Sequence, residues 1–283
     1  MSNRPANGTM KSRSTDNRRS AFRRPDTAAS DKVRAKKFLG QHFLRSDEVA
    51  QRIVDSLSSE QPYVLEIGPG MGVLTQHLIQ RNGQEVCAIE IDSESVEYLH
   101  THYHSLHVIE GDFLRLDLME LFHAPFAVIG NFPYNISSQI LFRVFDHRDS
   151  IPELVGMFQK EVAERVVAAP GSKTYGILSV LLSAFYDMEY LFTGSEQMFD
   201  PPPKVKSAVI RMRRNAVAHL DCDEKLFVQI VKAGFNQRRK TLRNALRQLN
   251  ADLSQIPDTM LSQRAEQLGV ADYVFLTQNI VMP

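Results

Sequence analysis

Val64-Leu-Glu-Ile-Gly-Pro-Gly-Met-Gly72 is the stretch that decides the fold, because an apolar run ends there in three closely spaced glycines. The apolar run predicts a buried β-strand over 64–67. The glycines predict a sharp turn that can approach a ligand closely, followed by a helix over 74–81. A strand, a glycine-rich loop and a helix in this order are typical of proteins built on a parallel sheet.

The alternation of strands and helices continues on both sides of this stretch. Helices are predicted from Asp47, over 93–100 and over 177–186. Apolar runs predict further strands over 86–89, 106–109, 127–129, 154–158, 190–192 and 208–212. This alternation predicts an α/β fold, with a Rossmann-like parallel sheet that carries helices on both faces.

Three segments are predicted along the chain of 283 residues. Residues 1–35 are polar and lack apolar periodicity, which predicts a disordered basic tail. Their Arg and Ser content is also typical of an organellar transit peptide, although three aspartates interrupt it. Residues 36–215 form the predicted α/β domain. Residues 216–283 are predicted to form a small α-helical domain, helical from Asp223 onward with interruptions at Pro257 and Gly269.

The net charge of zero conceals a strong asymmetry along the chain. Residues 1–37 carry a net charge of +8, residues 38–203 carry −14, residues 204–247 carry +9 and the remainder carries −3. Two basic segments around an acidic body favour a polyanionic partner that meets only part of the surface. The alternative is that each basic run is simply a solvated face.

Several classes of protein are disfavoured by composition. Cys87 and Cys222 lie far apart, so they predict no disulfide framework and favour a reducing compartment. No apolar run is long enough to span a bilayer, and the N-terminus lacks the apolar segment of a secretory signal. Four histidines between 100 and 107 have no ligand spacing for a metal. We therefore expect a cytoplasmic monomer without a metal or a membrane anchor.

Acidic residues close three successive predicted strands. Glu66 precedes the glycine loop, Glu90 lies 22 residues after Gly68, and Asp112 ends the third strand. An acid at the place of Glu90 binds ribose hydroxyls, and Asp112 can accept from an adenine amine. The spacing G-x-G-x-G differs from the G-x-G-x-x-G that binds a dinucleotide pyrophosphate. An acid beside the loop suits an ammonium and a sulfonium, so the pattern favours S-adenosylmethionine (SAM) over a nicotinamide cofactor.

Asn131-Phe-Pro-Tyr134 follows the predicted strand over 127–129 at the sheet edge where ligands bind. The side-chain oxygen of Asn131 and the carbonyl of Phe132 or Pro133 can accept hydrogen bonds from an exocyclic amine. Tyr134 can stack on the ring that carries this amine. The stretch therefore predicts a pocket for a flat, amine-bearing base, and the alternative is a capped and stiffened turn.

A set of motifs in order across about residues 36–280 resembles the ribosomal RNA adenine N6,N6-dimethyltransferases. The matching stretches are Lys37-Phe-Leu-Gly-Gln-His-Phe-Leu44, Glu66-Ile-Gly-Pro-Gly70, Ile89-Glu-Ile-Asp92, Gly111-Asp112, Asn131-Phe-Pro-Tyr-Asn-Ile-Ser137, Met157-Phe-Gln-Lys-Glu161, Phe199-Asp-Pro-Pro-Pro-Lys-Val205 and Phe235-Asn-Gln-Arg-Arg-Lys-Thr-Leu-Arg-Asn244. Two positions depart from the family pattern. Phe132 stands where the family usually has Leu, and His42 stands where it often has Asn.

The resemblance implies a class I methyltransferase sheet and SAM as cofactor. It implies that His42 and Leu44 close over the cofactor and that Gly68 and Gly70 approach its methionine part. It also implies that Glu90 holds the ribose and Asp112 the adenine. Asn131 is implied to lie between cofactor and substrate. The implied substrate is a pair of adjacent adenosines near the 3′ end of 16S rRNA, each methylated twice. The implied partner is a partly assembled small ribosomal subunit.

The expected chemistry needs orientation rather than a strong base. Acceptors at Asn131 and at Phe132 or Pro133 would turn the lone pair of the adenine N6 atom toward the methyl group. Tyr134 and Phe199 would form the walls around the base. Arg238, Arg239 and Lys240 would contact RNA phosphates. A large-subunit rRNA methylase and a non-catalytic assembly factor are the alternative functions.

Overall fold

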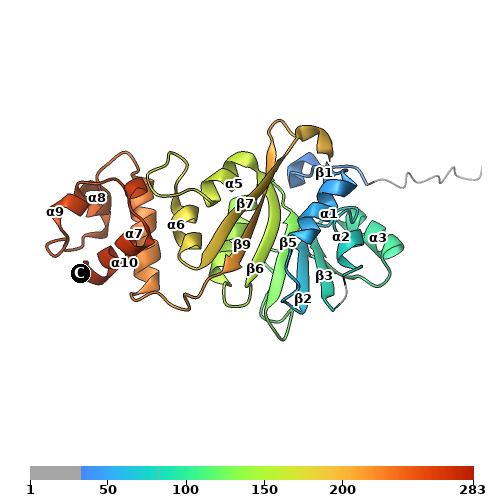
Figure 1. Cartoon of the computed structure of the whole chain (residues 1–283), viewed down its shortest axis with the longest axis horizontal. Helices are drawn as coiled ribbons and strands as arrows, with labels where there is room; N and C mark the ends of the chain where they lie inside the picture. The colour runs from blue at the N-terminus through green and yellow to red at the C-terminus, as the bar shows by residue number, and fades with distance from the viewer. Residues whose placement is uncertain (1–32, 82) are drawn as a thin grey trace, which may run out of the picture. The chain divides into compact units, whose positions relative to one another are not determined.

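A seven-stranded β-sheet forms the centre of the computed structural model, which describes residues 33–81 and 83–283. The strands lie in the order β4-β3-β2-β5-β6-β9-β7 (Figure 1). Their bounds are β2 Tyr63–Ile67, β3 Glu85–Glu90, β4 His107–Glu110, β5 Phe126–Asn131, β6 Glu153–Gln159, β7 Tyr186–Gly194 and β9 Ser207–Arg214. All seven predicted strands are present. The predicted disordered tail lies outside the described residues, apart from its last three.

The sheet is mixed rather than wholly parallel. Strands β4, β3, β2, β5 and β6 are parallel to one another, whereas β9 is antiparallel to both β6 and β7. Parallel neighbours need a long crossover, usually a helix. Only the short 3-10 helix η2 (Glu196–Met198) and strand β8 (Phe199–Asp200) lie between β7 and β9. The chain therefore returns alongside β7 in the antiparallel sense, which differs from the predicted parallel arrangement.

Alternate residues of the strands face two different helical layers. Val64 and Ala127 pack with Ile53 of helix α1 (Asp47–Asp55), on the face that also carries α2 (Thr75–Leu78) and α3 (Ser93–His102). Their neighbours in sequence, Leu65 and Val128, pack with α4 (Ser137–Asp146), α5 (Lys160–Val166) and α6 (Ile177–Ser183). Helices thus cover both faces, as predicted. Two helices are shorter than predicted. The helix predicted over 74–81 is α2, which is flanked by turns, and the helix predicted over 177–186 is α6, which ends before β7 begins at Tyr186.

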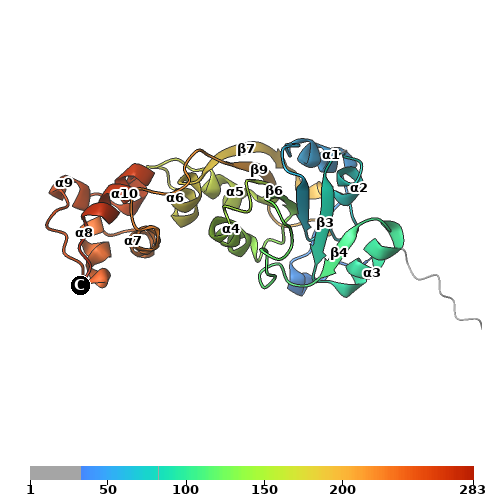
Figure 2. The same cartoon turned by 90° about the horizontal axis from the view of Figure 1, so that it is seen from below.

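The C-terminal segment contains four helices, of which the first and the last lie beside α6 in both views (Figures 1 and 2). They are α7 (Glu224–Asn236), α8 (Leu242–Ala245), α9 (Asp258–Leu261) and α10 (Val270–Asn279), joined by turns and by the 3-10 helices η3 (Leu246–Leu249) and η4 (Ala265–Gln267). Asn250 ends η3 in the left-handed conformation, with φ 51°, so this segment is less continuously helical than predicted.

One hydrophobic core joins these helices to the sheet. It includes Phe227 of α7, Tyr273 of α10 and Leu178 of α6 together with the inner face of β6. Residues 33–283 form one compact unit. The division into domains at residues 215 and 216 therefore stays a prediction. No helix within the described residues is long and apolar enough to cross a membrane.

A strap, defined here as residues 36–44, precedes the first long helix. It contains the 3-10 helix η1 (Lys37–Leu39) and the short strand β1 (Phe43–Leu44). Strand β1 pairs antiparallel with β8, which lies more than 150 residues later, at Phe43 opposite Asp200 and Leu44 opposite Phe199. This pairing brings the strap to the carboxyl edge of the sheet. Nothing in the periodicity of the sequence predicts it.

Candidate active site

A pocket opens at the carboxyl ends of β2, β3 and β5, beneath the strap. It brings together seven of the residues predicted from the sequence: His42, Gly68, Gly70, Glu90, Asn131, Pro133 and Tyr134. Leu44 lines an adjoining pocket that shares Phe43, Gly68 and Asn131 with the first. The predicted strand ends therefore meet at one edge of the sheet, as parallel strands require.

The glycine loop adopts a conformation that other residues rarely tolerate. Gly68 and Gly70 have φ values of 67° and 57°. A Cβ atom on Gly70 would lie 2.8 Å from Cε1 of Phe43 in the strap. Gly70 must therefore be glycine for two reasons: the turn needs a positive φ, and the strap residue Phe43 leaves no room for a Cβ atom.

Glu66 is buried beside this loop with no basic side chain paired to it among the described residues. Its Oε2 accepts a hydrogen bond of 2.6 Å from Oγ1 of Thr75. Burial, together with the nearby charge of Glu90, raises the pKa of Glu66 to about 8 despite the Thr75 hydroxyl. The adjoining pocket thus holds an acid, Glu66, that a cationic ligand would stabilise in its charged form.

The buried Glu66 predicts a pH-dependent stability for the ligand-free protein. Because folding raises its pKa, its contribution to stability is complete below about pH 4.5 and is lost as the pH rises through about 8. We expect Glu66→Gln to melt about 4 °C higher than the wild type at about pH 9, and the difference to vanish toward about pH 5. Thermal unfolding across this pH range measures the effect, and a pH-independent difference would contradict it.

Glu90 is fixed by three backbone donors at the end of β3. Its Oε2 accepts from the N–H of Gly70 at 3.0 Å, and its Oε1 accepts from the N–H groups of Ile91 and Asp92 at 2.9 and 3.0 Å. Burial raises the pKa of Glu90, and these hydrogen bonds oppose the rise. The carboxylate is therefore held in one orientation at the floor of the pocket, between the glycine loop and α3.

Asn131 is oriented by the strap. Its Nδ2 donates a hydrogen bond of 2.9 Å to the carbonyl oxygen of His42. Because a carbonyl can only accept, the amide nitrogen must face the strap and the Oδ1 atom must face away from it. Oδ1 accepts no hydrogen bond from the described residues, so it is available as an acceptor in the pocket.

The carbonyls of Phe132 and Pro133 differ in their availability. The Pro133 carbonyl already accepts from the N–H of Ile136 at 3.3 Å and from Oγ of Ser137 at 3.0 Å. The Phe132 carbonyl has no donor among the described residues. Phe132 as a whole is only 1% exposed, and it is one of the residues that line the pocket.

Tyr134 is held by a contact that the sequence did not predict. Its hydroxyl lies 2.6 Å from Oγ of Ser207, at the start of β9. The ring of His42 stacks on Tyr134, with centroids 5.4 Å apart, and His42 Nδ1 lies 2.8 Å from the carbonyl oxygen of Pro201. Ser207 was missed because it is a small residue in an apolar strand, which carries no sequence signal of its own.

Five other predicted residues lie outside the main pocket. Asp112 follows β4, and its Oδ1 accepts from the N–H of Leu114 at 2.9 Å. Phe199 is 3% exposed and packs in the core beneath the strap, so its role as a wall for the base stays a prediction. Arg238, Arg239 and Lys240 follow α7, in the C-terminal helical segment.

The comparison with known families tests the resemblance drawn from the motifs. Residues 32–274 match the family described as ribosomal RNA adenine dimethylase. The chain belongs to this family. It is therefore a SAM-dependent enzyme that methylates adenine in ribosomal RNA, and the resemblance drawn from its motifs is confirmed.

Curated relatives agree over most of their length. A protein of Cytophaga hutchinsonii named ribosomal RNA small subunit methyltransferase A is 58% identical over 251 residues, covering 87% of this chain and 97% of its own. A protein of the same name from Parabacteroides distasonis is 57% identical over 249 residues, covering 87% and 93%.

Two solved structures share the fold. A dimethyladenosine transferase from Plasmodium falciparum superposes with a TM-score of 0.70 at 26% identity, covering 83% of this chain and 96% of its own. The 23S rRNA methyltransferase ErmE superposes with a TM-score of 0.61 at 25% identity, covering 83% and 99%. The Rossmann-like class I methyltransferase fold is thereby confirmed.

The pocket suits the cofactor of this family. SAM carries an ammonium and a sulfonium, and the pocket presents the buried acids Glu66 and Glu90 beside two glycines that leave room at the loop. In such a site Glu66 and the glycine loop would face the methionine part, and Glu90 the ribose. These assignments of single residues are predictions, whereas the dependence on SAM follows from the family.

Proposed function

We propose that this enzyme transfers four methyl groups in total to the N6 atoms of two adjacent adenosines near the 3′ end of 16S rRNA. The identity of 53–58% to proteins named small subunit methyltransferase A supports this choice of substrate over a large-subunit site. The observation that carries the chemistry is the orientation of Asn131, whose amide nitrogen is held by the strap while its oxygen is left for the substrate.

Two acceptors orient the amine in the proposed site. The Asn131 Oδ1 and the Phe132 carbonyl would each accept a hydrogen bond from the adenine N6 amine, so that its lone pair points at the methyl group. Bound SAM supplies this methyl on a positively charged sulfur, a good leaving group. The Pro133 carbonyl is engaged by Ile136 and Ser137, so we assign the second acceptor to Phe132. The methylated nitrogen carries a positive charge until it releases its proton to water. No strong base is required, because this cation is acidic and because orientation and hydrogen bonding supply the rate enhancement.

Tyr134 would hold the flipped base by stacking on its ring. The contact with Ser207 fixes the Tyr134 hydroxyl, and His42 covers one side of the aromatic ring. A target adenine must leave its own stack to reach an enclosed site, and an aromatic face compensates for the stacking that is lost. The base would therefore lie against Tyr134, next to the two acceptors.

The RNA phosphates would meet the exposed cations after α7. Arg239 and Lys240 are exposed and form no ion pair within the described residues. Arg238 is different, because its guanidinium donates to the Lys173 carbonyl at 2.6 Å and lies 3.6 Å from Glu266. We therefore assign Arg238 chiefly to the junction between α7 and the loop before α6. Arg239 and Lys240 are left as the phosphate contacts.

The proposed partner is a partly assembled small ribosomal subunit, met by a monomeric enzyme in the cytoplasm. An enzyme that needs its target adenosines accessible would act during assembly. The exposed cations after α7 fit a surface that binds RNA through its phosphates.

Methyl transfer from labelled SAM to purified small subunits tests the proposal. We expect incorporation into unmethylated small subunits, mapped to N6,N6-dimethyladenosine at two adjacent positions near the 3′ end of 16S rRNA. Large subunits from the same cells are the control substrate. Methylation confined to the large subunit, or no incorporation into either, would refute the proposed function.

A further inference from the structure

The strap contributes a continuous wall to the cofactor pocket. Leu39, Gly40, Gln41, His42 and Phe43 all line it. The C-terminal end of the strap is held by the pairing of β1 with β8 and by the hydrogen bond from Asn131 to His42. A separate set of contacts holds its N-terminal end.

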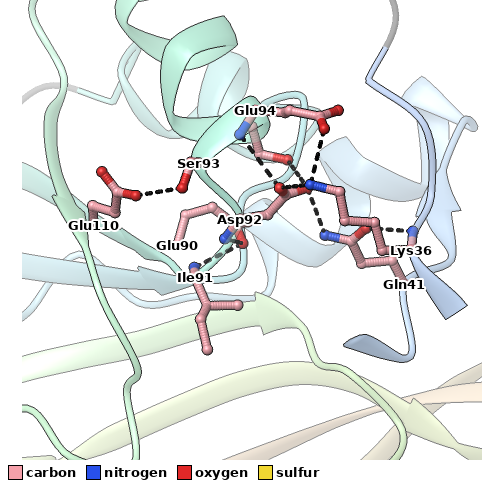
Figure 3. Close-up of polar contacts among 9 residues, drawn as sticks. Lys36, Gln41, Glu90, Ile91, Asp92, Ser93, Glu94 and Glu110 are labelled. Atoms are coloured by element: carbon pink, nitrogen blue, oxygen red, sulfur yellow. Dashed lines mark hydrogen bonds and ion pairs between the residues drawn. The ribbon is translucent and has the colours of Figure 1, made fainter. Parts of the chain in front are cut away.

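These contacts join the strap to the first turn of α3 (Figure 3). The ammonium of Lys36 forms an ion pair with Asp92 and a second with Glu94, the latter at 3.1 Å. Gln41 Nε2 donates to Asp92 Oδ2 at 3.2 Å, and the backbone N–H of Lys36 donates to Gln41 Oε1 at 2.8 Å. Lys36 and Gln41, which lie on either side of η1, therefore both bind the carboxylate of Asp92.

Asp92 is a firm anchor for this contact. Its side chain is 1% exposed, and it also accepts from the N–H of Glu94 at 3.3 Å and from Oγ of Ser95 at 3.2 Å. Burial raises the pKa of Asp92, but the hydrogen bonds from Lys36 and Gln41 outweigh it and the pKa lies below its ordinary value. Asp92 is thus charged at neutral pH, and Lys36 is the cation that pairs with it in the described part of the chain.

The anchor is connected to the proposed ribose site. The N–H of Asp92 donates to Oε1 of Glu90, so the same turn orients Glu90 and holds the strap. Figure 3 shows Glu90, Asp92, Lys36 and Gln41 converging on this turn. A cofactor seated on Glu90 would be enclosed between that turn and the strap. Movement of the strap would therefore open a path by which the cofactor could leave.

We propose that Lys36, Gln41 and Asp92 are positioning residues that latch the strap over bound SAM and so set the rate at which the cofactor leaves. The proposal rests on the proposed cofactor site. Lys36 acts through the strap and through Asp92, since it does not line the pocket. A purely architectural ion pair would instead affect folding stability and leave cofactor release unchanged.

The test compares the full-length variants Lys36→Met and Lys36→Arg with the wild type. Lys36→Met keeps the apolar stem and removes the charge, whereas Lys36→Arg keeps the charge. Lys37→Met is the matched control, because the neighbouring Lys37 is exposed and lacks an ion pair among the described residues. Stopped-flow displacement of SAM measures its dissociation rate, calorimetry measures its affinity, and thermal unfolding measures the stability of the ligand-free protein.

We expect SAM to dissociate about tenfold faster from Lys36→Met, with a matching loss of affinity and an unchanged association rate. Lys36→Arg should restore most of the affinity, and Lys37→Met should behave as the wild type. An unchanged dissociation rate in Lys36→Met would overturn the latch, whatever its melting temperature. A wild-type protein that bound no SAM would instead refute the proposed cofactor site, so the two failures are distinguishable.

Discussion

Asn131→Ala should lower kcat for methyl transfer by about 10²–10³-fold, because it removes the acceptor that orients the N6 amine. The Nδ2 atom of Asn131 is committed to the His42 carbonyl, so its Oδ1 is the atom left for the substrate. The lost acceptor acts mainly in the transition state, where the nitrogen becomes tetrahedral. The loss should therefore fall on kcat rather than on KM for the ribosomal subunit.

Single-turnover methylation of small subunits at saturating SAM measures this loss directly. SAM affinity is measured in parallel, because Asn131 also supports the strap, and we expect it to weaken by only about threefold. Asn135→Ala is the matched control, since Asn135 is an exposed amide four residues further along the chain. A variant Asn131→Ala that kept a rate within about tenfold of the wild type would argue against the proposed orientation of the amine.

Gly156→Ala should impair both folding and catalysis, because the ring of Phe132 occupies the space above Gly156. Gly156 on β6 lies opposite Gly130 on β5. A Cβ atom on Gly156 would lie 2.0 Å from Cε2 of Phe132, and one on Gly130 would lie 2.7 Å from Cε1. Phe132 is only 1% exposed, and its ring packs on Phe158, with centroids 4.9 Å apart. Overpacking at such a site costs about 1–3 kcal/mol of stability.

The catalytic loss from Gly156→Ala follows from the place of Phe132 in the chain. A displaced Phe132 ring shifts the main chain between Asn131 and Pro133. This shift moves both proposed acceptors, the Phe132 carbonyl and the Oδ1 atom of the Asn131 side chain. A misplacement of about 1 Å can cost about 100-fold in rate, so we expect a fall in kcat of about 10–100-fold. SAM affinity should change little, because the glycine loop and Glu90 are on other strands.

The double variant Gly156→Ala/Phe132→Leu distinguishes this mechanism from general destabilisation. Leu is the residue that the family usually has at this position, and it is smaller than the Phe132 ring. We expect Phe132→Leu alone to cost about 1 kcal/mol through a small void, and the double variant to recover most of the stability and kcat lost by Gly156→Ala. Strictly additive effects in a double-mutant cycle would contradict a direct contact between ring and glycine.

The sequence determined most of the fold because its signals are local. The strand over 64–67, the glycine turn and the acids Glu66 and Glu90 follow from residues next to one another, and parallel strands then bring their carboxyl ends to one edge. The family follows from motifs spread over the chain. Phe132 departs from the family pattern, and the sequence alone does not predict what its ring contacts.

The tertiary structure decided the contacts between distant segments. The pairing of β1 with β8, the attachment of Asn131 to His42 and the clasp of Lys36 and Gln41 on Asp92 join residues 50 or more positions apart. The structure also distinguished the engaged Pro133 carbonyl from the available one of Phe132, and revealed the glycines that accommodate the Phe132 ring. Periodicity and spacing cannot predict such contacts, because they depend on how the packed elements lie in space.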